Sequence, residues 1–145
     1  MPKKNGRSVV VLLRFRAWLK EDKEMVDVEE IHFYKGEFDF IGDAITWMCK
    51  SNDCVLMQST GLRDKNGKEI FEGDIIAIEV EDVETPINAK VFQNRKIGIL
   101  MFHVFEDNED VPMVELLEDD SVAFAVIGNI WEDGELLDVE NTEEN

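Results

Sequence analysis

The stretch Ser59-Thr-Gly-Leu-Arg-Asp-Lys-Asn-Gly-Lys-Glu-Ile-Phe-Glu-Gly-Asp-Ile-Ile-Ala-Ile78 decides how the rest of the chain is organised. Asn66-Gly67 predicts a two-residue type I′ turn, because that turn needs positive φ at both central positions and these residue types tolerate it. Gly73-Asp74 marks a second turn, which leads into the apolar run from Ile75 to Val80. The stretch therefore predicts a β-hairpin followed by the entry into a further strand.

Short apolar segments alternate with polar turns on both sides of this stretch. This spacing is typical of the strands of a barrel or sandwich. The expected strands cover residues 9–18, 25–28, 31–35, 55–58, 75–80, 89–92, 97–105, 113–117 and 122–127. Ile41, Ala44, Ile45 and Met48 instead fall at helical spacing. We therefore expect a mainly β fold, a small antiparallel barrel-like or sandwich domain with one short helix near residues 40–50.

The length of 145 residues fits one domain. We expect a flexible basic arm at residues 1–8, a single β-rich domain at residues 9–137 and a disordered acidic tail at residues 138–145. The longest apolar run, Val9–Leu13, is far shorter than the roughly 18 residues of a membrane helix. Arginines follow it where a signal peptide has a small-residue cleavage site. The sequence thus predicts an intracellular protein without membrane association.

The charge of the chain is unevenly distributed. The net charge is −18, and residues 97–145 contain 15 acidic residues and no Lys or Arg. Because contacts to phosphate need cations, we do not expect this acidic third to bind nucleic acid directly. The basic first 20 residues and this acidic third permit attraction within one molecule or between neighbours.

The motifs of enzymes and cofactor sites are missing from the sequence. His32 and His103 are the only imidazoles, and no nucleophile motif accompanies them. Cys49 and Cys54 form a C-x4-C pair without the further ligands of a zinc site. The glycines of the opening stretch fit neither phosphate-binding fingerprint, and its acidic residues miss the positions of a calcium loop. We therefore predict no catalytic residue, no metal and no cofactor, and a protein that is not an enzyme.

Several residues of the opening stretch and of a later Gly-Asn pair are suited to turns. Asp64 is placed to accept a hydrogen bond from the amide of Asn66 or Gly67 in an Asx-type turn. Turn chemistry also accounts for each glycine of the opening stretch. The alternative interpretation is a loop surface that docks a partner. We interpret the following motif residues as structural: Thr60, Gly61, Asp64, Asn66, Gly67, Gly73, Asp74, Gly128 and Asn129.

Three sequence blocks carry a resemblance to a known family. They are Phe15-Arg-Ala-Trp18, the segment from Met57 to Ile75, and the segment from Val126 to Glu132 with Leu136-Leu137 after it. In order and spacing they resemble the YopX-like proteins of bacteriophages and prophages. The resemblance implies a small β-rich domain in the cytoplasm of a bacterial host, and it implies no activity, cofactor or catalytic residue. The family commonly has an aromatic residue where Ser59 stands, so local packing is expected to differ there.

These observations lead to one main hypothesis and two alternatives. The main hypothesis is a non-enzymatic phage accessory protein that binds itself or an unknown phage or host protein. It depends partly on residues 97–105, whose apolar character on both faces suggests a central strand or an intermolecular contact. The first alternative is an acidic nucleic-acid mimic in which residues 106–144 occupy the groove of a DNA-binding protein. An enzyme is the remote alternative.

Overall fold

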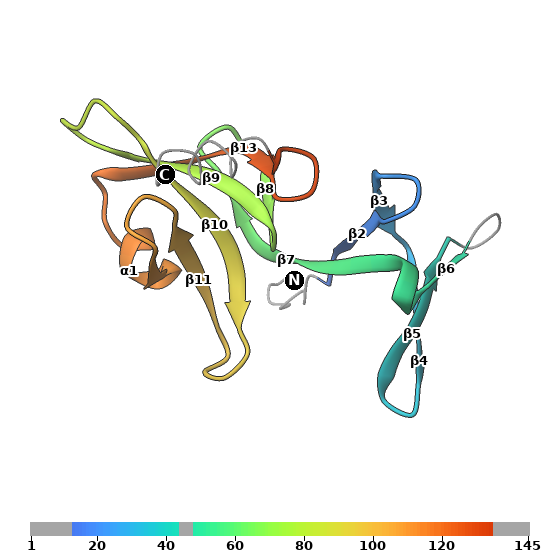
Figure 1. The fold of residues 1–145 in the computed structure, drawn as a ribbon. Coiled ribbons are helices and arrows are strands. Elements are labelled where there is room, and N and C mark those ends of the chain that lie inside the picture. The colour runs from blue at the N-terminus through green and yellow to red at the C-terminus, as the bar shows by residue number, and fades with distance from the viewer. Residues whose placement is uncertain (1–12, 44–47, 135–145) are drawn as a thin grey trace, which may run out of the picture.

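The computed structural model describes residues 13–43 and 48–134. These residues form a mainly β structure with two lobes, which are joined by one long strand (Figure 1). In chain order the strands are β2 Phe15–Leu19, β3 Glu24–Val28, β4 Glu30–Tyr34, β5 Glu37–Gly42, β6 Met48–Lys50, β7 Cys54–Arg63, β8 Glu69–Phe71, β9 Asp74–Val80, β10 Ile87–Asn94, β11 Ile99–Val104, β12 Glu109–Pro112 and β13 Val122–Asn129. A 3₁₀ turn, η1 (Ser51–Asp53), precedes β7, and the α-helix α1 (Met113–Leu117) follows β12.

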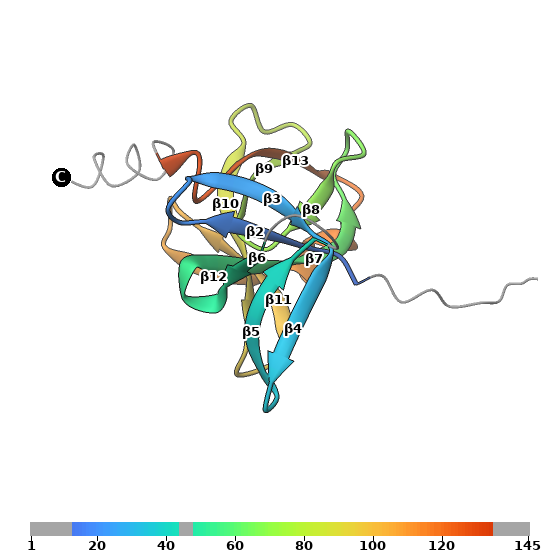
Figure 2. The same cartoon turned by 90° about the vertical axis from the view of Figure 1, so that its right-hand side faces the viewer.

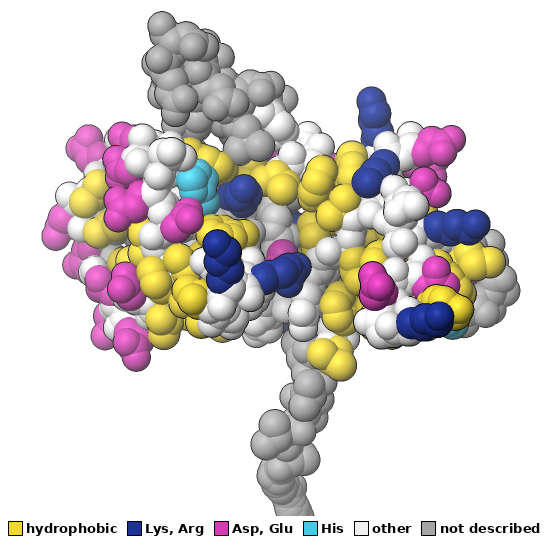
Figure 3. Space-filling model, turned by 60° about the horizontal axis from the view of Figure 1, so that its bottom comes forward, with side chains coloured by type: hydrophobic (Ala, Val, Ile, Leu, Met, Phe, Trp, Pro, Cys, Tyr) yellow, Lys and Arg dark blue, Asp and Glu magenta, His cyan; other side chains and the backbone are white. Residues whose placement is uncertain are grey.

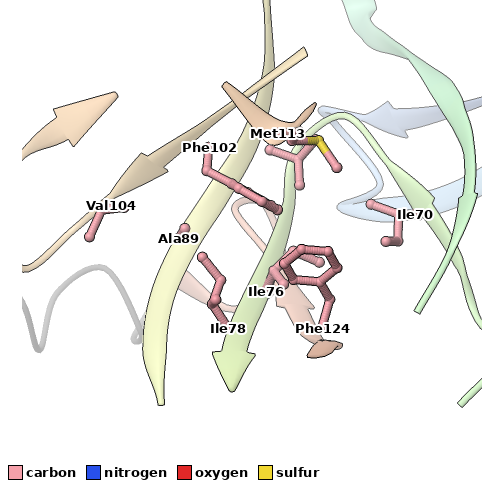
Figure 4. Close-up of a cluster of buried hydrophobic side chains, with 9 residues drawn as sticks. Ile70, Ile76, Ile78, Ala89, Phe102, Val104, Met113 and Phe124 are labelled. Atoms are coloured by element: carbon pink, nitrogen blue, oxygen red, sulfur yellow. The ribbon is translucent and has the colours of Figure 1, made fainter. Parts of the chain in front are cut away.

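The C-terminal lobe is a strongly curled, half-barrel sheet with the strand order β12-β11-β10-β9-β13. All of its neighbouring strands are antiparallel. Its concave side encloses the larger hydrophobic cluster, in which Phe102 and Phe124 meet at 5.3 Å between ring centroids (Figure 4). Met113 of α1 is buried against the same cluster and covers one end of the sheet. Burial of these aromatic and aliphatic groups is the main stabilising contribution to this lobe.

The N-terminal lobe contains β2 to β6 and the start of β7, whereas β8 lies with the C-terminal lobe, where Ile70 packs in the larger cluster. These strands form two smaller sheets (Figure 2). One has the strand order β3-β2-β7-β8, and the other has the order β4-β5-β6. Among the residues that the structure describes, the buried members of their shared cluster are Ala17, Ile41 and Cys54. Strand β7 pairs with β2 along residues 54–58 and with β8 beyond them. The same strand therefore contributes to the N-terminal lobe at its start and leads into the C-terminal lobe at its end.

The opening stretch forms the predicted hairpin, but its turn differs from the predicted one. Gly67 has a φ of 84°, whereas Asn66 does not have positive φ, so the turn is not type I′. The Gly67 amide donates to the carbonyl of Asp64 at 3.0 Å, and the Asp64 amide donates to the carbonyl of Lys68 at 2.8 Å. This is the pattern of a three-residue loop with a single left-handed residue at Gly67. The predicted second turn is confirmed, because Gly73 has a φ of 86° and β9 begins at Asp74.

The predicted helix near residues 40–50 is wrong. Residues 40–42 belong to β5 and residues 48–50 form β6, and these two segments pair with each other. Residues 44–47 lie outside the described residues. Phe38 and Phe40 alternate with the exposed Glu37 and Asp39, so the local period is two rather than 3.6. The pairing of β5 with β4 and β6 therefore prevails over a helical spacing that extended for little more than two turns.

The helix of the described chain lies at residues 113–117, where the sequence predicted a strand. Pro112 precedes it, in a position that suits the start of a helix. Met113 and Leu116, three residues apart, both contact the core of the C-terminal lobe. A five-residue segment is too short for its period to be read from sequence alone, because it spans less than two helical turns.

The predicted arm at residues 1–8 and the predicted tail at residues 138–145 both lie outside the described residues. The predicted strand at residues 9–18 is described only from residue 13, and within the described residues β2 covers Phe15–Leu19. Among the helices in the described parts of the chain, none has the length and apolar character needed to cross a membrane.

Candidate functional site

The three sequence blocks meet at one buried junction between the lobes. Arg16 of β2 donates from Nη2 to Oδ1 of Asp74 at 2.8 Å and to the carbonyl of Glu72 at 3.1 Å. Its guanidinium group lies 4.7 Å from the centroid of the Phe71 ring. The other carboxylate oxygen of Asp74 accepts the Phe71 amide at 2.8 Å. Arg16 and Asp74 therefore link the first block to the central one.

The ion pair between Arg16 and Asp74 is almost completely buried. The side chains of Arg16 and Asp74 are 11% and 2% exposed. Burial raises the pKa of Asp74, and the Arg16 charge and the Phe71 amide offset only part of that effect. Arg16 turns into the junction between the lobes, whereas the side chain of Arg14, two residues earlier, is 52% exposed. The pair has the character of a structural link between lobes.

Gly73 allows the third block to approach this junction. A β-carbon at Gly73 would lie 3.0 Å from Sδ of Met57 and 3.6 Å from Nε1 of Trp131. The carbonyl of Gly73 accepts the amide of Ile130 at 2.9 Å. Trp131 is stacked on Trp18 with 6.4 Å between ring centroids. Segments that are far apart in the sequence thus pack around Gly73. A residue with a side chain would be strained there, because it would crowd Met57 and would have to adopt a positive φ.

Asp64 connects the tip of the hairpin to β13. Its Oδ1 accepts the amides of Asn66 at 2.9 Å and Lys68 at 2.8 Å, and its Oδ2 accepts the amide of Val126 at 2.8 Å. Burial opposes its ionisation, but these three amides, together with the Lys68 charge, lower the pKa of Asp64 below its ordinary value. The predicted Asx-type bond to Asn66 is confirmed, and the bond to Val126 is a tertiary contact that the sequence did not reveal.

Thr60 and Gly61 occupy an irregular part of the pairing between β7 and β8. The hydroxyl of Thr60 donates to the carbonyl of Ile70 at 2.7 Å and accepts the amide of Leu62 at 3.1 Å. Gly61 has a φ of 81°, and the register shifts between Ser59 and Arg63 at this point. Both residues therefore lie in an irregular bulge, where β7 has two residues more than β8 between the paired positions.

Gly128 and Asn129 organise the turn that follows β13. A β-carbon at Gly128 would lie 2.5 Å from Oδ2 of Asp133, so a side chain there would displace that carboxylate. Oδ1 of the buried Asn129 accepts the amides of Trp131 at 3.0 Å and Glu132 at 2.8 Å. This turn places Trp131 against Trp18. In the described structure each of the nine motif residues thus lies in a turn, at a bulge or at the junction.

The two histidines belong to different lobes and do not form a common site. His32 of β4 lies 2.9 Å from Glu30 and is stacked on Phe40 with 4.2 Å between ring centroids. His103 of β11 lies with Nδ1 2.7 Å from Oδ1 of Asp110. In the described ranges no three His, Cys, Asp or Glu side chains are grouped as metal ligands would be. The geometry therefore gives neither histidine the third partner of a nucleophilic triad.

The two cysteines lie close together beside a groove of about 860 Å³ between β2, β3 and β6. Sγ of Cys49 and Sγ of Cys54 both approach the carbonyl of Lys50, at 3.8 and 3.5 Å. Burial, followed by the neighbouring Cys49 thiol, raises the pKa of Cys54 to about 12. Because the thiolate is the reactive form, we expect Cys54 to react slowly in the folded protein.

Alkylation with iodoacetamide at pH 8 is expected to distinguish these cysteines. Cys49 is half-buried and should react at least tenfold faster than Cys54, whose thiol stays protonated at this pH. Mass spectrometry of peptides over a time course measures both rates, and the Cys49→Ser variant isolates Cys54. In guanidinium chloride the two rates should become similar. Equal rates in the folded protein would contradict the buried position of Cys54.

A group of exposed apolar side chains surrounds the end of the β10–β11 hairpin and α1. We call Ile97, Ile99, Val114 and Leu117 the hairpin–helix patch; they are 60%, 39%, 56% and 43% exposed. Three of them line a groove of about 490 Å³, whose floor includes Leu100 and Met113. Figure 3 shows hydrophobic side chains gathered on this lobe, with Lys and Arg toward the other lobe and acidic groups toward the outer end.

The acidic residues between positions 97 and 121 lie beyond this patch. Glu106–Asp110 occupy the turn before β12 and the start of that edge strand, and Glu115 and Glu118–Asp120 lie on α1 and the following turn. All of these acidic residues are exposed. They are therefore distributed over two turns, one strand and one helix, not along one regular row.

Comparison with solved structures shows the same fold in two bacterial proteins. The protein EF1440 from Enterococcus faecalis is 28% identical, with a TM-score of 0.64 over 88% of this chain and 99% of that one. The protein yopX from Bacillus subtilis is 18% identical, with a TM-score of 0.61 over 85% of this chain and 96% of that one. No curated protein matches the chain.

The sequence model of the family described as YopX protein matches residues 14–138. This range contains the three blocks that meet around Gly73 and nearly all of the described structure. The resemblance seen in the sequence is therefore confirmed at the level of the family. The chain belongs to the YopX family.

Proposed function

We propose that this YopX-family protein is a non-enzymatic module that docks on another protein chain through the hairpin–helix patch. One observation supports this most directly: three exposed large apolar side chains line a single groove, and a fourth, Ile97, directly precedes Gly98, which also lines it. Soluble proteins rarely leave apolar groups together on the surface unless a partner covers them. The groove has an apolar floor and rim, with Gln93 as its polar side chain, which suits docking better than chemistry.

The predicted two-faced apolar strand is consistent with this proposal. β11 lies between β10 and β12, so most of its apolar side chains pack inside the sheet and the core. Ile99 at its start and Ile97 before it are the exposed exceptions. The apolar character of this segment therefore has two causes, core packing along the strand and an uncovered surface at its beginning.

Two further expectations belong to the same proposal. A non-enzymatic role accords with the positions of His32 and His103 in separate lobes. The phage or prophage context and the cytoplasmic location depend on the family resemblance alone. The neighbourhood of the gene tests the first, and fractionation of host cells tests the second. A nucleic-acid mimic would need carboxylates in one regular row, so the distribution over turns, strand and helix favours docking through the apolar patch.

Site-specific photo-crosslinking tests the proposal. A benzoylphenylalanine residue replaces Ile99 in one variant and Ile127 in another, because Ile127 is 43% exposed but lies on β13, away from the patch. In purified protein and in bacterial lysate, position 99 is expected to yield discrete covalent adducts with protein and position 127 few. Equal labelling at the two positions, or none at position 99, would refute docking through the patch.

A further inference from the structure

We propose that the partner of the hairpin–helix patch is a second copy of this chain, related by a two-fold axis through the centre of the patch. The inference rests on the proposed function and names the occupant of the same surface. It depends on the distribution of charge around the four apolar side chains. In a two-fold contact each subunit presents the same surface, so the patch has to be complementary to itself.

The hairpin side of the patch is basic. Arg95 and Lys96 lie in the β10–β11 turn directly before Ile97, and both are exposed. Arg95 approaches Glu72 only at 3.9 Å and keeps 79% of its side chain exposed. A contact at that distance in water contributes little, so the cationic character of this end persists.

The helix side of the patch is acidic. Val114 and Leu117 lie on the groove side of α1, while Met113 and Leu116 face the core. Glu115 directly follows Val114 in α1, and Glu118 directly follows Leu117 as the C-cap residue. Both carboxylates are exposed, and no Lys or Arg occurs after residue 96. This end of the patch is therefore negative.

These two ends give the patch the symmetry that a two-fold dimer requires. Rotation by 180° about an axis that lies in the contact plane, perpendicular to the line from the basic end to the acidic end, places the basic end of each copy opposite the acidic end of the other. The apolar groups then cover one another in the middle, and the charges pair at the rim, which is the usual anatomy of an interface. Figure 3 shows the same sequence of basic, apolar and acidic side chains across this face. A two-fold axis parallel to that line would instead bring like charges together at each end.

The experiment begins with the oligomeric state of the intact chain. Sedimentation equilibrium from about 1 to about 100 μM, the range that reveals a micromolar dissociation constant, is expected to show a monomer–dimer equilibrium. Leu117→Asp should weaken the dimer by at least tenfold. Ile127→Asp serves as the matched control, since both side chains are 43% exposed, and it should leave the dissociation constant unchanged.

Charge reversal tests the two-fold arrangement itself. Arg95→Glu/Lys96→Glu makes both ends of one variant acidic, and Glu115→Lys/Glu118→Lys makes both ends of another basic. Each variant alone should dimerise at least tenfold more weakly than wild type. An equimolar mixture should form a heterodimer, because each of its two rim contacts then pairs opposite charges. Recovery on mixing also shows that both variants are folded.

Three results would overturn the inference. They are a monomeric wild type over the whole range, a dimer that Leu117→Asp leaves intact, and reversal variants that do not recover on mixing. A monomeric wild type that still yields crosslinks from position 99 to another protein overturns this inference and leaves the proposed function standing. Absence of both dimer and crosslinks overturns the two together.

Discussion

Replacing Asp74 with alanine is expected to lower the free energy of unfolding by about 3–5 kcal/mol, the cost of leaving a buried charge without its partner. The Arg16 side chain, which is 11% exposed, would remain charged without its carboxylate partner, and the Phe71 amide would lose its hydrogen-bond acceptor. Urea unfolding at pH 7, followed by circular dichroism, measures the change. The effect should be among the largest of any single substitution, because one side chain serves both the ion pair and the turn.

Two further variants separate the buried charge from general damage. Arg16→Met combined with Asp74→Ala should be less destabilised than Asp74→Ala alone, because no charge is then left in the junction. Lys65→Ala removes one partner of the exposed pair with Glu79, whose side chains are 44% and 41% exposed, and should cost less than about 1 kcal/mol. If Asp74→Ala and Lys65→Ala lowered the free energy of unfolding by the same amount, the buried ion pair would contribute no more to stability than an exposed one.

Replacing Asp64 with asparagine is expected to lower the free energy of unfolding by about 2–3 kcal/mol at pH 7, the magnitude of hydrogen bonds to a charged acceptor. The asparagine side chain has one oxygen in place of two, so its NH₂ group must face an amide that Asp64 now accepts. Either the hairpin tip or the contact to Val126 loses its bond. The variant should still fold, because the turn itself keeps its backbone hydrogen bonds.

The effect of Asp64→Asn should depend on pH in a defined direction. The folded pKa of Asp64 lies below the ordinary value of 3.8, so its stabilising contribution is complete above that value. As the pH falls through 3.8 toward the lower folded pKa, the wild type loses this contribution and the variant has none to lose. The difference in stability should therefore shrink in acid, as urea unfolding at pH 7, 4 and 3 would show. A difference that grows below pH 4 would contradict the lowered pKa.

The sequence predicted the hairpin and most strands because turn residues and apolar alternation are local signals. Gly67 and Gly73 lie at positive φ, and β9 follows Gly73 as expected. The turn type at Asn66 was missed because the side chain of Asp64, bonded to backbone amides, favours the three-residue loop. Local patterns therefore located the turn without determining its geometry.

The buried junction and the hairpin–helix patch are formed by residues that are far apart in the chain, so the sequence did not predict either of them. Arg16 and Asp74 are 58 positions apart, and nothing in the alternation around Arg16 distinguishes an inward arginine from a solvated one. Val114 and Leu117 were expected on a strand, and only the helix places them beside Ile99. The apolar segment at residues 97–105 was the one signal of the patch, since its apolar content exceeds what a one-sided strand needs.

The shared strand β7 constrains how this chain can change in length. Its first half is in register with β2 and its second half with β8, so an insertion or deletion of one residue within it would turn side chains to the wrong face in both lobes at once. The bulge at Gly61 already accommodates one departure from regular pairing. Exposed turns such as the one around Asp82 carry no such double constraint. Length variation among relatives should therefore accumulate in such turns and avoid the strand that both lobes share.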